Sequence, residues 1–146
     1  FWNQSTRTTP SLLFNNVYTN PTDGISYAYN FYFQMNNCIM YGNQDDEFAT
    51  DFYPGPDTTY FFNSSLLKTK RQNSEAFINY TNCVFNRDPK FVNNQYNFHL
   101  DTLSPAIGIG NPFYSVGALQ YDLDGVSREN APDAGAYQYV PITNEE

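Results

Sequence analysis

The chain has 146 residues, which fits one domain. Its 15 acidic side chains outnumber the 7 of Lys and Arg and give a net charge of −8, so the composition excludes a nucleic-acid binder, which needs cations against phosphates. No apolar run approaches the roughly 18 residues of a membrane-spanning helix, so we expect no membrane span.

The residue types favour strands and turns. Aromatic residues reach 18% and charged residues only 15%, against a usual charged share of about 25%. Asn occurs 19 times, whereas the strong helix formers Ala, Leu, Glu and Lys are scarce. Aromatic side chains suit pleated strands and Asn suits turns, so the composition predicts an all-β protein. The chain begins with Phe1 and has no signal peptide, so we expect a processed or trimmed piece of a longer protein.

A short pattern recurs four times in the first 85 residues: an aromatic or apolar residue, Asn or another small polar residue, then a short apolar run. When Val17, Cys38, Ser65 and Cys83 are aligned, the copies are 21, 27 and 18 residues apart. One short strand every 20 residues or so is typical of a solenoid, and nothing indicates paired helices or regularly spaced Leu. The pattern predicts a right-handed parallel β-helix of four to five coils over residues 1–110. The four copies are residues 14–18 (FNNVY), 35–41 (MNNCIMY), 62–67 (FNSSLL) and 80–85 (YTNCVF).

This register makes two further predictions. Asn side chains at the same place in successive coils can form hydrogen-bonded ladders, and Asn tolerates the left-handed backbone of sharp corners. Cys38 and Cys83 lie two coils apart, about 9.6 Å, whereas a disulfide needs Cα atoms within about 7 Å. We therefore expect two free, inward-facing cysteines. The alternative is a disulfide between them, as is common in secreted proteins.

Strand alternation places Tyr27, Tyr29, Phe31 and Phe33 on one face. The sequence favours this face as core, with an aromatic platform for sugar rings as the alternative. The longest insertion carries Tyr53, where an exposed aromatic edge could also contact glycan.

Acidic and basic side chains follow neighbouring copies of the pattern and should leave the same corner on adjacent coils. This grouping predicts a ligand surface, although surface ion pairs worth about 0–1 kcal/mol are the simpler interpretation. β-Helix polysaccharide lyases use carboxylates with calcium and a nearby basic residue in this way. The candidate ligand surface comprises Asp45, Asp46, Asp51, Tyr53, Tyr60, Lys70 and Arg71.

A set of motifs in order fills the C-terminal third, and residues 37–43 (NCIMYGN) belong with it. The set resembles the C-terminal end of bacterial right-handed parallel β-helix surface proteins, common in Bacteroidetes. The resemblance implies that fold and an extracellular or outer-membrane surface location, but no activity. We expect residues 111–146 to form a segment that caps the last coil, where an open sheet edge would invite aggregation. The C-terminal motifs are residues 88–92 (DPKFV), 96–100 (YNFHL), 103–110 (LSPAIGIG), 122–128 (DLDGVSR) and 131–139 (APDAGAYQY).

Two features of this third could carry chemistry. Asp122 and Asp124 with Gly125 resemble part of a calcium loop, but the acidic residues of an EF-hand are missing, so a turn is favoured over a metal site and no cofactor is expected. Arg128 could pair with one of the nearby acids. His99 is the only histidine and is expected to be a half-buried strand residue.

The sequence therefore supports a non-catalytic C-terminal β-helix module of a secreted or cell-surface bacterial protein, with polysaccharide or host glycan as the expected partner. The alternative is the end fragment of a polysaccharide lyase or another carbohydrate-active β-helix enzyme, and a third interpretation is a purely structural stalk and cap. The N-terminal edge has no cap of its own. Upstream coils of a longer chain, or another copy, are expected there.

Overall fold

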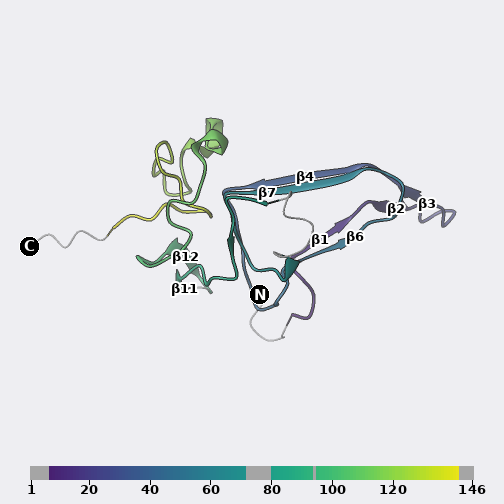
Figure 1. Cartoon of the computed structure of the whole chain (residues 1–146), viewed down its shortest axis with the longest axis horizontal. Coiled ribbons are helices and arrows are strands. Elements are labelled where there is room, and N and C mark those ends of the chain that lie inside the picture. Colours follow the sequence, from purple (N-terminus) through teal and green to yellow (C-terminus); the bar gives the residue numbers. More distant parts are fainter. Residues whose placement is uncertain (1–6, 72–79, 94, 142–146) are drawn as a thin grey trace, which may run out of the picture.

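The computed structural model describes residues 7–71, 80–93 and 95–141 (Figure 1). Within them there is no α-helix, so the all-β prediction is confirmed. Parts of both predicted segments, 1–110 and 111–146, lie outside the described residues, among them Phe1 and Trp2. The strands are β1 (Leu12–Asn15), β2 (Val17–Thr19), β3 (Ser26–Ala28), β4 (Phe31–Asn36), β5 (Ile39–Met40), β6 (Phe48–Asp51), β7 (Thr58–Asn63), β8 (Leu66–Leu67), β9 (Tyr80–Thr81), β10 (Val84–Phe85), β11 (Phe91–Asn93) and β12 (Asn97–Leu100), and the 3-10 helices are η3 (Pro112–Tyr114) and η4 (Gly117–Gln120).

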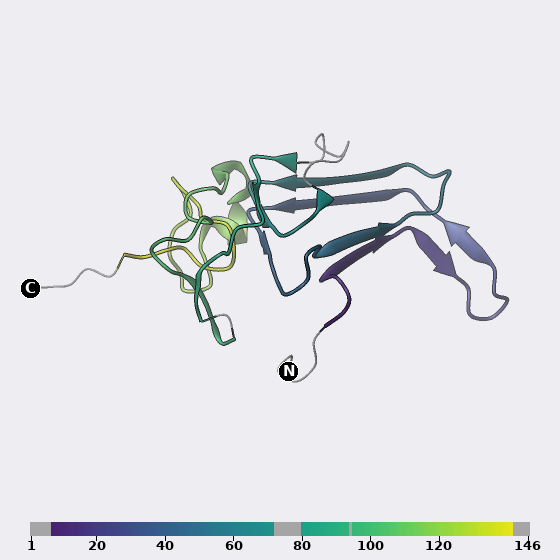
Figure 2. The same ribbon diagram turned by 60° about the horizontal axis from the view of Figure 1, so that its bottom comes forward.

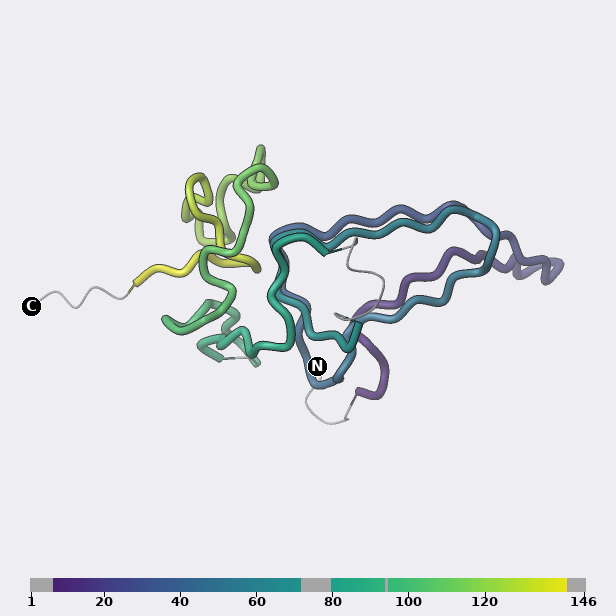
Figure 3. The backbone as a smooth tube through the Cα atoms, in the orientation of Figure 1, coloured from purple at the N-terminus to yellow at the C-terminus, as the bar shows by residue number. Residues whose placement is uncertain are grey.

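Most strands pair in parallel with a strand from the next pass of the chain. β4, β7 and β9 form one three-stranded parallel sheet, β5, β8 and β10 form a second, and β1 pairs in parallel with β6. We call β1, β4 and β5 the first row, β6, β7 and β8 the second, and β9 and β10 the third. Figure 3 shows the first two rows running alongside each other around a flattened ring. Four to five coils were expected over residues 1–110, whereas the described parallel pairings comprise three rows and end at Phe85.

The predicted alignment of the repeats is correct for three of its four copies. Asn36 pairs with Asn63, and Ile39 with Leu66, which places Cys38 beside Ser65. Val84 pairs with Leu66, which places Cys83 on the other side of Ser65. Both cysteines are free, as expected, and burial raises the pKa of each thiol.

The predicted alignment is wrong for the first copy, because Val17 does not lie in line with Cys38, Ser65 and Cys83. It starts β2, which pairs antiparallel with β3 and projects as a hairpin from the first row. The sequence Phe-Asn-Asn-Val at residues 14–17 is similar to the other copies, but it follows β1, whose partner in the second row is β6. Four similar residues therefore occur at two different corners of the ring, and the sequence pattern did not distinguish them.

The corner between the first two sheets has the left-handed backbone predicted for it. Asn37, Ser64 and Asn82 occupy the same position in the three rows, with φ of 51°, 49° and 52°. Non-glycine residues seldom adopt such angles, and Asn is enriched among those that do. A side-chain ladder accompanies the corner, because the Nδ2 of Asn63 donates to Oδ1 of Asn36 at 2.8 Å.

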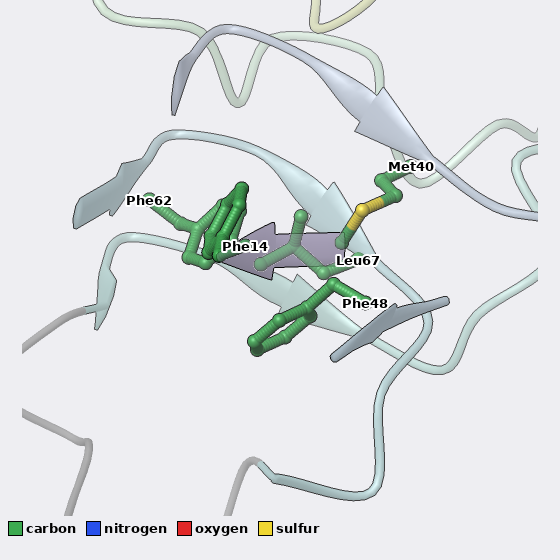
Figure 4. Packing of buried hydrophobic residues seen from close by; sticks show 5 residues of the cluster. All are labelled: Phe14, Met40, Phe48, Phe62 and Leu67. Atoms are coloured by element: carbon green, nitrogen blue, oxygen red, sulfur yellow. The ribbon is translucent and has the colours of Figure 1, made fainter. Parts of the chain in front are cut away.

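Aromatic rings fill the inside of the ring. The buried side chains here come from the first two rows and from all three parallel sheets (Figure 4). They are Phe14, Met40, Phe48, Phe62 and Leu67. The ring of Phe62 lies 5.1 Å from that of Phe48 and 5.6 Å from that of Tyr80, between centroids. Stacked rows thus place aromatic side chains against aromatic side chains, as the composition suggested.

Only half of the predicted aromatic face is core. This face comprises Tyr27, Tyr29, Phe31 and Phe33. Phe31 and Phe33 pack against the core, as favoured, but Tyr27 and Tyr29 are 44% and 56% exposed. The reason is that Tyr27 belongs to the projecting hairpin and Tyr29 to the corner before β4, so neither lies inside the ring.

The chain after β10 packs on the outer side of the β5–β8–β10 sheet. In this sheet alternate residues point inward and outward, so Leu67 joins the ring core while Leu66 contacts a second cluster. This second cluster contains the buried side chains of Leu100, Ala106 and Ala134. Figure 2 shows the C-terminal segment beside the rows. These contacts lie on the side of the rows, and the predicted cover over the end of the last coil stays a prediction.

Asn37 fixes the C-terminal segment to the corner. Its Nδ2 donates to the carbonyl of Asn111 at 3.0 Å, and its Oδ1 accepts from the Asn111 N–H at 2.8 Å. The carbonyl of Asn37 also accepts from the N–H of Gly135 at 2.9 Å. Gly135 has φ of 106°, a backbone that strains any residue with a Cβ, and a Cβ there would also lie 2.9 Å from Cδ1 of Ile39.

We expect Asn37→Ala to lower the free energy of unfolding by about 2–3 kcal/mol. The substitution removes three partly buried side-chain hydrogen bonds, two with Asn111 and one with Ser115, and replaces a residue that tolerates the left-handed backbone. Urea denaturation followed by circular dichroism measures this. Asn82→Ala is the matched control and should cost less, since Asn82 has the same backbone but makes no side-chain hydrogen bond to the described part of the C-terminal segment. Equal losses in both variants would contradict the role of Asn37 in docking.

Candidate functional site

Acidic and basic side chains meet at one corner of the ring, as predicted. We call Asp45, Asp46, Lys70 and Arg71 the acid–base corner. Nζ of Lys70 lies 3.0 Å from Oδ2 of Asp45, and Nε of Arg71 lies 3.4 Å from Oδ2 of Asp46. The hydrogen bond from Lys70, together with its charge, lowers the pKa of Asp45. Stacking of the second row on the first brings these four groups together, as the repeat register predicted.

These charges are engaged with one another. Thr69 is fully buried, and its hydroxyl donates to Oδ1 of Asp46 at 2.8 Å while it accepts from the N–H of Arg71. The side chains of Lys70 and Asp45 are 69% and 74% exposed, and such pairs contribute little to stability. A shallow depression of about 470 Å³ lies beside them. The geometry is that of a surface ion-pair network with a buried threonine at its centre.

The other members of the predicted ligand surface lie elsewhere. Asp51 ends β6, at the opposite end of that strand from Asp46, and accepts a hydrogen bond from Asn15 at 3.4 Å. Tyr60 packs in the ring core, 5.6 Å from Phe14 between ring centroids. Tyr53 is 61% exposed. The structure therefore divides the predicted surface between three places, and the sequence could not separate them because strand position decides which side each residue faces.

Asp122 and Asp124 belong to a turn. Oδ1 of Asp122 accepts from the N–H groups of Asp124 at 2.9 Å and Val126 at 2.7 Å, and its Oδ2 accepts from the N–H of Gln138 at 2.7 Å. Partial burial raises the pKa of Asp122, but these hydrogen bonds outweigh it and hold the pKa below its usual value. Gly125 has φ of 81°, as such a turn requires. Within 7–71, 80–93 and 95–141, no group of three or more His, Cys, Asp or Glu side chains is placed to hold a metal ion.

His99 lies in β12 and is half-buried, as expected. Its Nε2 is 2.6 Å from Oδ2 of Asp124, and its ring stacks on Tyr137 with 3.9 Å between centroids. A depression of about 500 Å³ borders this pair and is lined mainly by apolar side chains, among them Val92 and Leu100. The contacts join β12 to the turn and to the last motif, which is a role in holding the C-terminal segment together.

The remaining C-terminal motif residues bond to one another. Arg128 is buried and donates to the carbonyls of Asp133 at 3.0 Å and Gly135 at 2.8 Å, where the sequence suggested an ion pair with Asp122 or Asp133. The carboxylate of Asp133 accepts from the N–H groups of Gly108 and Tyr139. The residues on which the family resemblance rests therefore build the fold of this segment.

The β2–β3 hairpin lies at the end of the ring farthest from the C-terminal segment (Figure 1). Exposed tyrosines lie in this hairpin and next to the strands β4 and β6. Tyr18 and Tyr27 are opposite each other in the β2–β3 hairpin, so their side chains share one face, and they are 55% and 44% exposed. Tyr29 precedes β4, and Tyr53 follows β6. We call Tyr18, Tyr27, Tyr29 and Tyr53 the tyrosine corner.

The buried side-chain amide of Asn16 holds the backbone of Tyr29 and Tyr53, two of these four tyrosines, in place. Asn16 is 6% exposed, and its Nδ2 donates to the carbonyls of Tyr29 at 3.1 Å and Tyr53 at 3.3 Å. Its Oδ1 accepts from the N–H of Tyr53 at 2.7 Å, and its carbonyl accepts from the N–H of Tyr29 at 2.9 Å. Sequence analysis assigned Asn16 to the ladder and missed this role, although the Asn-Asn pair before the hairpin was a signal for it.

The described helices are the short η3 and η4, and neither is long or apolar enough to cross a bilayer.

Comparison with protein-family models, with curated proteins and with solved structures finds no match.

Proposed function

We propose that the chain is the C-terminal module of a secreted or cell-surface bacterial protein, folded as a right-handed parallel β-helix, that contacts glycan without catalysis. The in-register parallel rows, the left-handed corner column and the Asn ladder support the β-helix. Parallel strands joined by crossovers are nearly always right-handed. Within the described residues, β1, β4 and β5 of the first row each pair with a strand on one side only, and upstream coils or another copy are the proposed partner at this edge.

The observation that carries the glycan proposal is the tyrosine corner. It has four tyrosines, each more than two-fifths exposed: the buried Asn16 holds the backbone of Tyr29 and Tyr53, and the β2–β3 pairing holds Tyr18 opposite Tyr27. Exposed large aromatic residues grouped in this way mark interaction sites. Tyrosine offers a ring face for the apolar side of a sugar and a hydroxyl for its polar side.

The acid–base corner supports the lyase alternative less well. A proton-abstracting base must reach the substrate, but Lys70 and Arg71 are paired with Asp45 and Asp46. No described observation favours catalysis over binding, so the lyase remains an untested prediction.

A glycan array probed with the labelled chain tests the proposal. We expect at least one glycan to bind, and Tyr18→Ala and Tyr53→Ala each to weaken its binding by roughly 5- to 30-fold, because losing one aromatic contact costs about 1–2 kcal/mol. Leu119→Ala, an equally exposed apolar truncation in η4, is the control and should not change binding. Binding to no glycan, or turnover of a uronic polysaccharide with a new ultraviolet absorbance, would contradict the proposal.

A further inference from the structure

The outer side of the β4–β7 pair carries a set of side chains not used by the ring core. Phe31, Phe33 and Met35 of β4 point inward, so the alternate residues point outward. Parallel pairing places Tyr32 opposite Thr59. We call the outward side chains the β4–β7 strip: Tyr32, Gln34, Asn36, Thr59, Phe61 and Asn63.

Hydrogen bonds hold the strip in one arrangement. The hydroxyl of Tyr32 donates to Oε1 of Gln34 at 2.9 Å, and Nε2 of Gln34 donates to Oδ1 of Asn36 at 3.0 Å. Asn63 donates to the same Oδ1 at 2.8 Å. These bonded side chains extend from Tyr32 to Asn36 of β4, about 13 Å, and their order is set before any ligand arrives.

The strip offers ring faces and hydrogen-bond donors. The rings of Tyr32 and Phe61 lie 6.2 Å apart between centroids, and Tyr32 is 67% exposed. Both acceptor positions of Asn36 Oδ1 are used, and within the described part of the chain its Nδ2 group has no partner. One N–H of Gln34 likewise remains for a ligand. These groups suit a ligand with many oxygen acceptors and an apolar face.

The strip has no charged side chain, and the protein as a whole carries a net charge of −8. An anionic polysaccharide would meet no cation there and a repulsive overall field. Complementarity of charge therefore favours a neutral ligand.

The strip continues from the tyrosine corner. β4 begins at Phe31, two residues after Tyr29, and Tyr32 is its first outward residue. No other described segment lies over the outer side of β4 and β7 along most of their length (Figures 1 and 2). A linear ligand that contacts the tyrosine corner could therefore extend along the strands.

We propose that the β4–β7 strip binds a neutral, unbranched polysaccharide, which lies along the strands from the tyrosine corner toward Asn36 and Asn63. This inference rests on the proposed glycan-contacting function and adds the class and path of the ligand. Sugar rings stack on Tyr32 and Phe61, and sugar oxygens accept from the amides of Gln34 and Asn36.

Isothermal titration of the 146-residue chain tests the inference. The probes are cellohexaose, mannohexaose and xylohexaose as neutral chains, and hexagalacturonate as the charged chain. We expect at least one neutral hexasaccharide to bind, Tyr32→Ala to weaken it by about tenfold, and Gln34→Ala by about threefold. Both side chains are exposed, so the variants should fold, which circular dichroism checks. Phe113→Ala, an exposed aromatic truncation in η3, is the control and should leave binding unchanged.

The outcomes separate this inference from the function on which it rests. Loss of binding in Tyr18→Ala and Tyr53→Ala, with Tyr32→Ala and Gln34→Ala unaffected, would overturn the strip and leave the tyrosine corner as the glycan site. Binding of hexagalacturonate alone would overturn the neutral class. Binding of none of the four probes would overturn the inference, and silence of the glycan array as well would overturn the proposed function.

Discussion

Phe62→Ala is expected to lower the free energy of unfolding by about 3–5 kcal/mol, the usual cost of truncating a buried Phe. Phe62 is fully buried, in the middle strand of the β4–β7–β9 sheet. Its ring contacts rings from both neighbouring rows, including those of Phe33 and Tyr80. Removing it would leave a cavity that stacked backbone rows cannot easily close. Urea denaturation followed by circular dichroism measures the loss.

Phe113→Ala is the matched control for this prediction. Phe113 is 76% exposed, so the same truncation there should change the free energy of unfolding by no more than about 0.5 kcal/mol. If Phe62→Ala does not fold, Phe62→Leu provides the measurement, with a smaller loss expected because it retains most of the apolar volume. A loss for Phe62→Ala no larger than for Phe113→Ala would show that the rows do not stack around Phe62.

Glu47→Gln is expected to cost about 3 kcal/mol. The Glu47 carboxylate is fully buried and accepts from Arg7 at 2.5 Å, from the Ser11 hydroxyl at 2.7 Å and from the Gln44 N–H at 2.9 Å. An amide in its place would direct its own N–H group at these donors and leave Arg7 without a carboxylate partner. Breaking a buried ion pair typically costs about 3–5 kcal/mol. The lower end applies because the Arg7 side chain is 18% exposed.

Asp45→Asn is the control for Glu47→Gln, since it makes the same chemical change two residues away in an exposed ion pair. It should cause no measurable loss. Equal losses in the two variants would contradict the buried role of Glu47. Chemical denaturation of both variants at neutral pH makes the comparison.

The effect of Glu47 should depend on pH. Burial raises the pKa of this carboxyl, but hydrogen bonds from Ser11, Arg7 and Gln44 outweigh it, so the folded-state pKa lies below the usual value of about 4.3. The unfolded chain therefore takes up this proton at a higher pH than the folded chain. The stabilisation is fully present above about pH 4.3 and is lost as pH falls through the lowered folded-state pKa. The difference between wild type and Glu47→Gln should shrink over that acidic range.

Local sequence was enough to predict the corner and most of the register. Asn37, Ser64 and Asn82 are residues that suit a left-handed or turn backbone, and each precedes a short apolar run. The same pattern failed at Val17, because a few residues before a hairpin are locally indistinguishable from a few residues before a strand in the ring. Single residues indicate where the backbone turns, but they do not indicate which strand will pair with the residues that follow.

Only the tertiary structure determined which surroundings each of the three acidic residues 45–47 has. Asp45 faces solvent, Asp46 joins Arg71 and Thr69, and Glu47 is buried with Arg7. The sequence grouped Asp45 and Asp46 in one ligand surface and gave no sign that Glu47 would be buried. Their differences arise from which residues of other rows lie beside each of them, since a carboxylate is buried only where enough donors converge on it.

The sequence by itself determined the all-β class, the free cysteines and the stacking of three copies of the repeat, because these follow from residue types and their spacing. It also placed acids beside bases. The tertiary structure decided which tyrosines are core and which are exposed: Tyr60 lies inside the ring, while Tyr53 lies at the corner held by Asn16. A side chain's direction depends on where its strand begins and on what packs beside it, and those contacts join residues that are far apart along the chain.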